Sequence, residues 1–360
     1  MFLISVQAPG KLYIAGEYAV VESGYPAIIV AVDQFVTVSV ENSEDVGSLI
    51  STQYQETPIV WRREGDEMVF DDRDNPFQYI LSAIRLTESY AREIGRKMTV
   101  YHMKIDSDLD SPDGKKYGLG SSAAVTVATI KALNEFYQLG LKKAQLFKLA
   151  AIAHLDIQGN GSLGDIAASV YGGWMAYQSF DHDWLASERH LKGLPELINE
   201  DWPGLSIELL TPPDKLELLI GWTGSPASTS HLVDRVAVMK AEQPDHYQAF
   251  LNQSKQCINR LVTGFRTNQL PVIQREITVN RRLLKKLADF SHVVIETPVL
   301  TKMCDIAERF GGAAKSSGAG GGDCGIVIIN KDQDINTMVK EWSANGIKRL
   351  KMNVHHVLGE

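Results

Sequence analysis

The sequence contains only three cysteines in 360 residues, Cys257, Cys304 and Cys324, and they are scattered. Their odd number and wide spacing argue against a disulfide framework or a cysteine metal site, and favour a reducing cytoplasmic compartment. Long apolar runs are also missing, because residues 27–32 form the longest one near the N-terminus and are far too few to span a membrane. The first residues lack the basic stretch and long apolar core of a signal peptide and predict a strand. We therefore expect a cytoplasmic protein that is not inserted in a membrane.

An excess of positive charge is absent as well. Lys and Arg number 36 and Asp and Glu number 44, so the formal net charge is −8. Such a chain has no overall basic field to attract nucleic acid or an anionic membrane, and any anionic ligand must be held by local positive charge. The basic run at residues 281–286 is typical of a solvated helix face rather than a nucleic-acid patch. The length is sufficient for two domains with full cores.

Small residues gather between Lys116 and Ala124, directly before an apolar segment that predicts a buried helix. Such residues leave backbone N–H groups accessible, and a helix start adds partial positive charge, so the segment suits a polyphosphate. Its serine hydroxyls are suitable ligands for a phosphate oxygen or a magnesium ion. An ordinary turn in which Ser121 or Ser122 caps the helix explains the same residues equally well.

Asp165 follows three glycines, Gly159, Gly161 and Gly164, that match the pattern G-x-G-x-x-G. A predicted helix precedes this match where a dinucleotide site requires a strand, so we reject a dinucleotide site. Asp165 begins a further predicted helix, where a carboxylate can act either as a functional group or as a cap.

Two more segments are unusual in composition. Residues 223–230 are rich in hydroxyl groups before a predicted helix, which suits either an anion site or a simple cap. Residues 311–325 place many glycines between a predicted helix and a predicted strand, at a high cost in chain entropy. Close approach to a ligand or to another backbone would explain that cost. Lys11 follows Pro9 and Gly10 at an expected strand end and, on residue chemistry alone, reads as a solvated lysine.

Periodicity and turn residues predict an α+β chain. Strands are expected over residues 2–7, 98–105, 174–178, 205–221 and 326–329, with a pair of strands within 27–40 and a hairpin at 59–61 and 68–70. Helices are expected over residues 77–94, 125–136, 142–155, 166–170, 298–309 and 337–346, with further helical periodicity over 231–290. The strand-rich beginning and helix-rich end indicate two domains, with a boundary within 180–230 that we set at 1–200 and 201–360.

Three segments in this order resemble the motifs of the galactokinase, homoserine kinase, mevalonate kinase and phosphomevalonate kinase (GHMP kinase) superfamily. They are residues 8–18 (APGKLYIAGEY), 118–124 (GLGSSAA) and 317–323 (SGAGGGD), and together they span nearly the whole chain. Within the superfamily, the sequence is most similar to the phosphomevalonate kinase family. The features that carry this similarity are Lys116 before the glycine loop (residues 118–124), GSLGD and YGG within residues 161–173, and WTGSPAST at residues 222–229.

The resemblance implies a two-domain fold, with an N-terminal α/β domain, a ferredoxin-like C-terminal domain and an active site between them. It implies that ATP phosphorylates (R)-5-phosphomevalonate to (R)-5-diphosphomevalonate in the mevalonate route to isoprenoids. The alternatives are mevalonate kinase or another small-molecule kinase of the superfamily, and a non-catalytic ligand-sensing relative. A sensor would be expected to lose Lys11 or Asp165, and both are present. A monomer or a homodimer is expected.

The same resemblance assigns roles by position. Lys11 and Asp165 are expected to flank the transferring phosphoryl group, and Ser122 to bind magnesium. The ATP phosphates are expected against Lys116, Gly118, Leu119, Gly120, Ser121, Ser122, Ala123 and Ala124. The acceptor is expected against Lys11, Tyr18, His154, Ser162, Asp165, Ser228, Thr229, Ser317, Gly318, Ala319 and Gly320.

The sequence departs from the superfamily at one position. Mevalonate kinases carry a magnesium-binding glutamate in the helix before the catalytic aspartate, and His154 stands there in this chain. Magnesium is then expected on Ser122, phosphate oxygens and water. A phosphate acceptor is largely deprotonated near neutral pH, because its second pKa is about 6. Cations should therefore matter more than a general base, and we expect Lys11→Met to reduce turnover more than Asp165→Asn.

Overall fold

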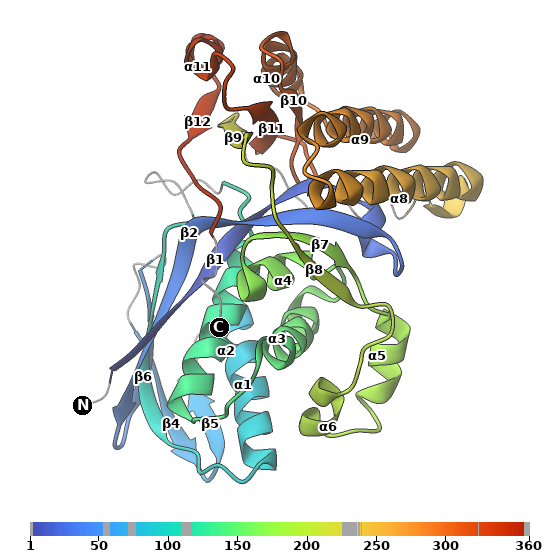
Figure 1. Cartoon of the computed structure of the whole chain (residues 1–360). Coiled ribbons are helices and arrows are strands. Elements are labelled where there is room, and N and C mark those ends of the chain that lie inside the picture. Colours follow the sequence, from blue (N-terminus) through green and yellow to red (C-terminus); the bar gives the residue numbers. More distant parts are fainter. Residues whose placement is uncertain are drawn as a thin grey trace.

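The computed structural model describes residues 3–52, 58–70, 77–109, 117–224, 240–322 and 324–355, together with Val236 and Val238. Within these residues the strands form two separate sheets, one of eight strands and one of four (Figure 1). None of the helices in these ranges is both long enough and apolar enough to cross a membrane.

The larger sheet has the strand order β5-β4-β3-β6-β2-β7-β8, and β1 pairs with β2 outside this path. Only β3 and β6 run parallel among its pairs. Its strands are β1 (Leu3–Ala15), β2 (Pro26–Ser43), β3 (Gly47–Ser51), β4 (Ile59–Glu64), β5 (Glu67–Phe70), β6 (Val100–Ser107), β7 (Trp174–Gln178) and β8 (Ser206–Leu210). The short 3-10 helix η1 (Ala19–Val21) follows β1.

Helices cover one face of this sheet (Figure 1). They are α1 (Gln78–Glu93), α2 (Ser121–Phe136), α3 (Lys143–Gln158) and α4 (Gly164–Tyr171), with the short α5 (His182–Glu188) and α6 (Leu194–Asn199) beyond them. Helix α2 packs directly on β1 and β2, and its small residues Ala123, Ala124 and Ala128 are completely buried. This close packing brings the start of α2 against the strand that carries Lys11.

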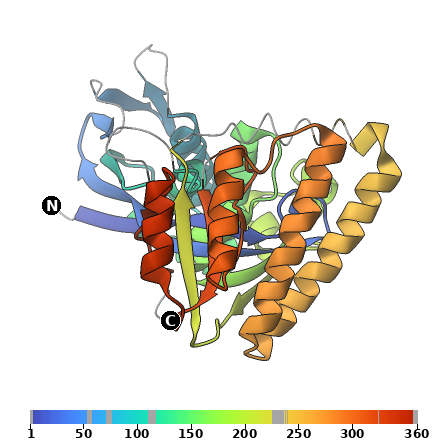
Figure 2. The ribbon, with the colours of Figure 1, turned by 90° about the horizontal axis from the view of Figure 1, so that it is seen from above.

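The smaller sheet has the order β10-β11-β9-β12, and helices pack beside it. Its strands are β9 (Leu216–Trp222), β10 (Ala313–Ser316), β11 (Cys324–Asn330) and β12 (Lys348–Leu350). The helices are α8 (Pro244–Arg266), α9 (Leu270–Ser291), α10 (Pro298–Arg309) and α11 (Ile335–Ala344), and Figure 2 shows α8, α9 and α10 in succession across this part of the molecule.

The two sheets share buried contacts. Residues of α8 and α9, including Phe265 and Ile273, belong to the same apolar cluster as the strands of the larger sheet. The ring of Trp174 in β7 lies 5.3 Å from that of Phe265. The chain also returns to the larger sheet after β12, where the His355 N–H donates to the Ala31 carbonyl at 2.9 Å. The protein therefore has a two-domain α+β fold with a continuous core at the junction.

Four local expectations differ from the structure. The first strand does not end at residues 8–10 but continues to Ala15, because a register shift between Pro9 and Gly10 accommodates the proline. Residues 26–43 form one long strand rather than a pair, and residues 205–221 form two strands rather than one. Strand β10 was expected as part of a glycine-rich loop. The division at residues 1–200 and 201–360 stays a proposal, and β8 still pairs with β7 of the larger sheet.

Candidate active site

Lys11 of β1 is hydrogen-bonded to the glycine loop through both its backbone and its side chain. Its backbone N–H donates to the Leu119 carbonyl at 2.8 Å, and its Nζ donates to the Gly118 carbonyl at 3.1 Å. The Nζ also lies 5.4 Å from the centre of the Tyr13 ring. The lysine is therefore held beside the loop and does not extend into solvent from a strand end.

Gly120 marks the point where Lys11 and Asp165 approach each other. Its φ of 78° lies in the left-handed region that favours glycine. A Cβ at this position would lie 3.0 Å from Lys11 Cε and 3.6 Å from Asp165 Cβ. The fold thus brings Lys11, Gly120 and Asp165 from three distant segments close together, and their roles in the site stay predictions.

Neither serine of the loop caps helix α2. Gly120 is the residue that precedes the helix, and no side chain of the described residues caps it with a hydrogen bond. The Ser122 hydroxyl instead lies 3.2 Å from His154 Nε2. The interpretation of the segment as a serine-capped turn is therefore wrong, whereas the first-turn N–H groups and hydroxyls remain suited to an anion.

His154 of α3 is buried beneath this loop, with only 1% of its surface exposed. Its ring packs on that of Tyr79 with centroids 4.8 Å apart. Burial lowers the pKa of His154, and the negative charge of Asp165 opposes this shift without reversing it. The imidazole is therefore neutral near neutral pH. Among the described residues its Nδ1 has no hydrogen-bond partner.

Asp165 lies in the first turn of α4 and is partly buried. Its Oδ1 accepts a hydrogen bond from the Ile166 N–H at 3.0 Å, so the carboxylate benefits from the positive end of the helix. The carboxylate is thus positioned locally by its own helix, beside Lys11 and Gly120.

Ser162 is fixed by two tyrosines. Its hydroxyl lies 2.7 Å from the Tyr13 hydroxyl, and its carbonyl accepts a hydrogen bond from Tyr177. Burial, followed by the charge of Asp165, raises the pKa of Tyr13, so this phenol stays protonated. The sequence interpretation assigned no role to Tyr13. Its spacing of two from Lys11 was the available signal, because residues i and i+2 of a strand share a face.

The third motif lies against the first. The Ser317 hydroxyl donates to the Tyr13 carbonyl at 2.8 Å, and the Tyr18 hydroxyl donates to the Ala319 carbonyl at 2.5 Å. Gly320 approaches the backbone of residue 295 so closely that a Cβ would lie 2.2 Å from the Ile295 carbonyl oxygen. The glycines of this loop therefore allow the close backbone approach that their entropy cost suggested.

Three predicted binding residues, Lys116, Ser228 and Thr229, lie outside the described residues. The others come from β1 and the turn after it, the start of α2, α3, the start of α4 and the loop after β10. Within the described ranges there is no group of three or more His, Cys, Asp or Glu side chains that could hold a metal ion.

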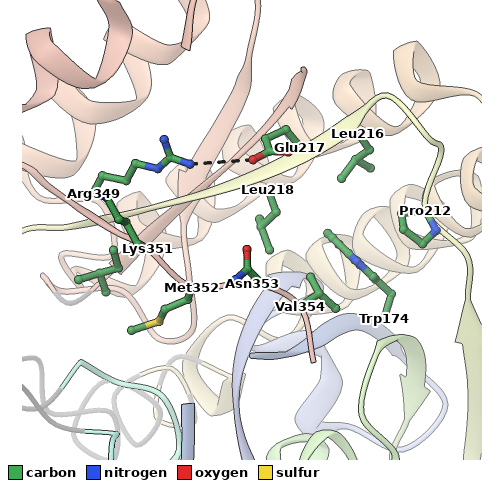
Figure 3. A pocket seen from close by; sticks show the side chains of 11 residues that line it. Trp174, Pro212, Leu216, Glu217, Leu218, Arg349, Lys351, Met352, Asn353 and Val354 are labelled. Atoms are coloured by element: carbon green, nitrogen blue, oxygen red, sulfur yellow. Dashed lines mark ion pairs between the residues drawn. The ribbon is translucent and has the colours of Figure 1, made fainter. Parts of the chain in front are cut away.

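A separate pocket of about 540 Å³ lies where β7, β9 and the segment after β12 meet (Figure 3). Apolar side chains such as Trp174, Leu218 and Met352 line it, and Arg349 pairs with Glu217 at 3.9 Å along one side. Among the described residues, none of the predicted site residues lines this pocket.

Comparisons with known proteins agree with this arrangement. The family model for the GHMP kinases N terminal domain matches residues 78–173, and the model for the GHMP kinases C terminal domain matches residues 261–348. The phosphomevalonate kinase of Streptomyces sp. (strain CL190) is 38% identical over 357 residues, covering 96% of this chain and 95% of that protein.

Two solved structures are also similar. A crystal structure of a protein from Listeria innocua has a TM-score of 0.93 and 40% sequence identity, and covers 99% of this chain and 98% of that one. Streptococcus pneumoniae phosphomevalonate kinase in complex with phosphomevalonate and AMPPNP has a TM-score of 0.85 and 31% identity, and covers 98% of this chain and 100% of that one. The chain therefore belongs to the phosphomevalonate kinase branch of the GHMP kinase family.

Proposed function

We propose that the protein transfers the γ-phosphoryl group of ATP to (R)-5-phosphomevalonate, which yields ADP and (R)-5-diphosphomevalonate for isoprenoid biosynthesis. The observation that carries this proposal is the meeting of Lys11, Gly120 and Asp165 at one point of the fold. The similarity to the Streptomyces enzyme and to the Streptococcus complex supports the choice of acceptor.

Lys11 has the central role in this proposal. Donor and acceptor are both phosphates, so the main barrier is the repulsion between two anions. A positioned ammonium group stabilises the charge that develops on the transferring phosphoryl group. The Gly118 carbonyl holds Lys11 Nζ beside the glycine loop. Asp165 then orients the acceptor and the lysine, and strong base catalysis is not required.

The start of α2 is the proposed site of the ATP phosphates, with backbone N–H groups and the serine hydroxyls as donors. A magnesium ion fits beside Ser122, whose hydroxyl is not consumed in capping the helix. Because His154 is neutral and no acidic cluster is present among the described residues, Ser122, the phosphates and water would hold the ion. The bound metal would neutralise phosphate charge.

Tyr18, His154, Ser162, Ser317, Gly318, Ala319 and Gly320 are proposed to surround the acceptor, together with Ser228 and Thr229 outside the described residues. Ser162 and Tyr18 are pre-positioned by the hydrogen bonds described above, which reduces the ordering cost of binding. A cytoplasmic location and a monomeric or homodimeric state complete the proposal.

An acceptor panel tests the function. Purified protein is incubated with ATP and magnesium, and ADP release is coupled to NADH oxidation with 5-phosphomevalonate, mevalonate, galactose or homoserine as acceptor. We expect kcat/KM for 5-phosphomevalonate to exceed that for mevalonate at least about 100-fold, because a site built for a charged group rejects an analogue that lacks it. Lys11→Met protein serves as the background control.

Two outcomes of the panel would contradict the proposal. Ready consumption of mevalonate with no turnover of 5-phosphomevalonate would make the protein a mevalonate kinase. Retained binding of ATP without ADP release for any acceptor would favour a ligand sensor.

A further inference from the structure

A buried ion pair joins the turn after β1 to strand β10 of the smaller sheet. Lys315 Nζ contacts Glu17 Oε1, although 298 residues separate the two in sequence. The lysine is completely buried and the glutamate is 3% exposed. Lys315 Nζ also donates to the Ser316 carbonyl at 2.6 Å. The pair therefore links the first superfamily motif directly to the strand that leads into the third.

Two hydrogen bonds flank this pair and connect the same two segments. The Ser317 hydroxyl bonds the Tyr13 carbonyl, and the Tyr18 hydroxyl bonds the Ala319 carbonyl. Residues 13–18 and 315–319 are thus connected at three successive points. Lys11 lies two residues before Tyr13 on β1, so a shift of the loop relative to this strand would also alter the surroundings of Lys11.

Stability does not explain why these charges are buried. Replacing a buried ion pair by apolar residues is often neutral or stabilising, whereas removing one partner alone is strongly destabilising. The desolvation of Glu17 is also incompletely compensated, because its Oε2 is buried and lacks a hydrogen-bond partner among the described residues. An arrangement with this cost is better explained by the geometry that it imposes.

We propose that Glu17 and Lys315 are positioning residues that fix the loop at residues 317–322 relative to Lys11, a role that rests on the proposed kinase function. The pair acts through the backbone of both segments and does not touch the reacting atoms. Its loss should therefore lower kcat more than it raises KM for ATP.

The test uses the full chain with Glu17→Gln, Lys315→Met and the double variant Glu17→Gln/Lys315→Met. Each is measured for melting temperature, for kcat and KM, and for amide hydrogen exchange in peptides covering residues 313–322. The matched control removes the exposed ion pair between β8 and α8, as Glu208→Gln/Arg266→Met.

We expect both single variants to melt at lower temperature than the wild type, and the double variant to recover most of this loss. In the double variant kcat stays at least about 10-fold below that of the wild type. The Ser317 N–H, which donates to the Cys324 carbonyl, and the Gly321 N–H, which donates to the Ile295 carbonyl, are expected to exchange faster than in the wild type. The control should match the wild type in kcat and exchange, because exposed pairs contribute little.

A double variant that regains wild-type kcat and exchange together with its melting temperature would overturn the proposal and leave the pair a purely structural feature. The exchange measurement needs no substrate. It therefore tests whether the ion pair fixes the loop even if the acceptor panel refutes the kinase function. Failure of the positioning proposal can thus be distinguished from failure of the proposed function.

Discussion

Lys11→Met is expected to lower kcat about 1,000-fold, because removal of one preorganised charge from a phosphoryl-transfer site typically has an effect of this order. Methionine retains much of the apolar length of lysine but removes the ammonium group that contacts the Gly118 carbonyl. Lys11 is only partly buried, so the melting temperature should change little. Steady-state ADP release with saturating substrates measures the loss.

Lys104→Met is the matched control for this substitution. Lys104 also lies on a strand of the larger sheet, is exposed, and pairs with Asp106 at 2.9 Å. We expect its kcat to remain within about twofold of the wild type, since an exposed ion pair contributes little to the fold. A folded Lys11→Met protein with near-wild-type kcat would show that Lys11 does not act on the transferring group.

Gly320→Ala is expected to lower the free energy of unfolding by about 3 kcal/mol, since steric overlap and a left-handed backbone both oppose the added methyl group. The φ of Gly320 is 77°, and its new Cβ would lie 2.2 Å from the Ile295 carbonyl oxygen. This neighbour is backbone and cannot move aside as a flexible side chain can. Equilibrium unfolding in urea measures the change.

Gly318→Ala separates the two causes. Gly318 has a similar φ of 70° in the same loop, but a Cβ there would meet nothing within 4 Å. Only the backbone cost of about 1 kcal/mol is then expected. Equal destabilisation by the two substitutions would mean that the close approach to Ile295 is not a feature of the folded protein in solution.

Much of the fold follows from local sequence signals. The predicted helix at residues 298–309 is α10, where Pro298 opens the helix and Thr297 accepts a capping hydrogen bond from the Leu300 N–H. The predicted hairpin appears as β4 and β5. These elements are determined by periodicity, caps and turns within a few residues, which is the range over which sequence patterns are informative.

The features that were missed depend on contacts between distant segments. Strand β1 continues through Pro9 and Gly10 because pairing with β2 resumes after the register shift. Strand β10 is only four residues long and is recognisable through its pairing with β11. The Glu17–Lys315 pair and the contact between Tyr13 and Ser162 likewise join residues with no local relationship. Only the resemblance to the superfamily indicated that Lys11, the loop at residues 118–124 and Asp165 belong together.

The central claim is that this site works mainly by neutralising the repulsion between two phosphates rather than by removing a proton from the acceptor. Comparing kcat for Lys11→Met and Asp165→Asn, both confirmed as folded and measured with 5-phosphomevalonate, tests it most directly. The account predicts the larger loss for Lys11→Met, because Asp165→Asn removes a group that a deprotonated acceptor does not need as a base. A larger loss for Asp165→Asn would contradict the account and assign the dominant role to the carboxylate.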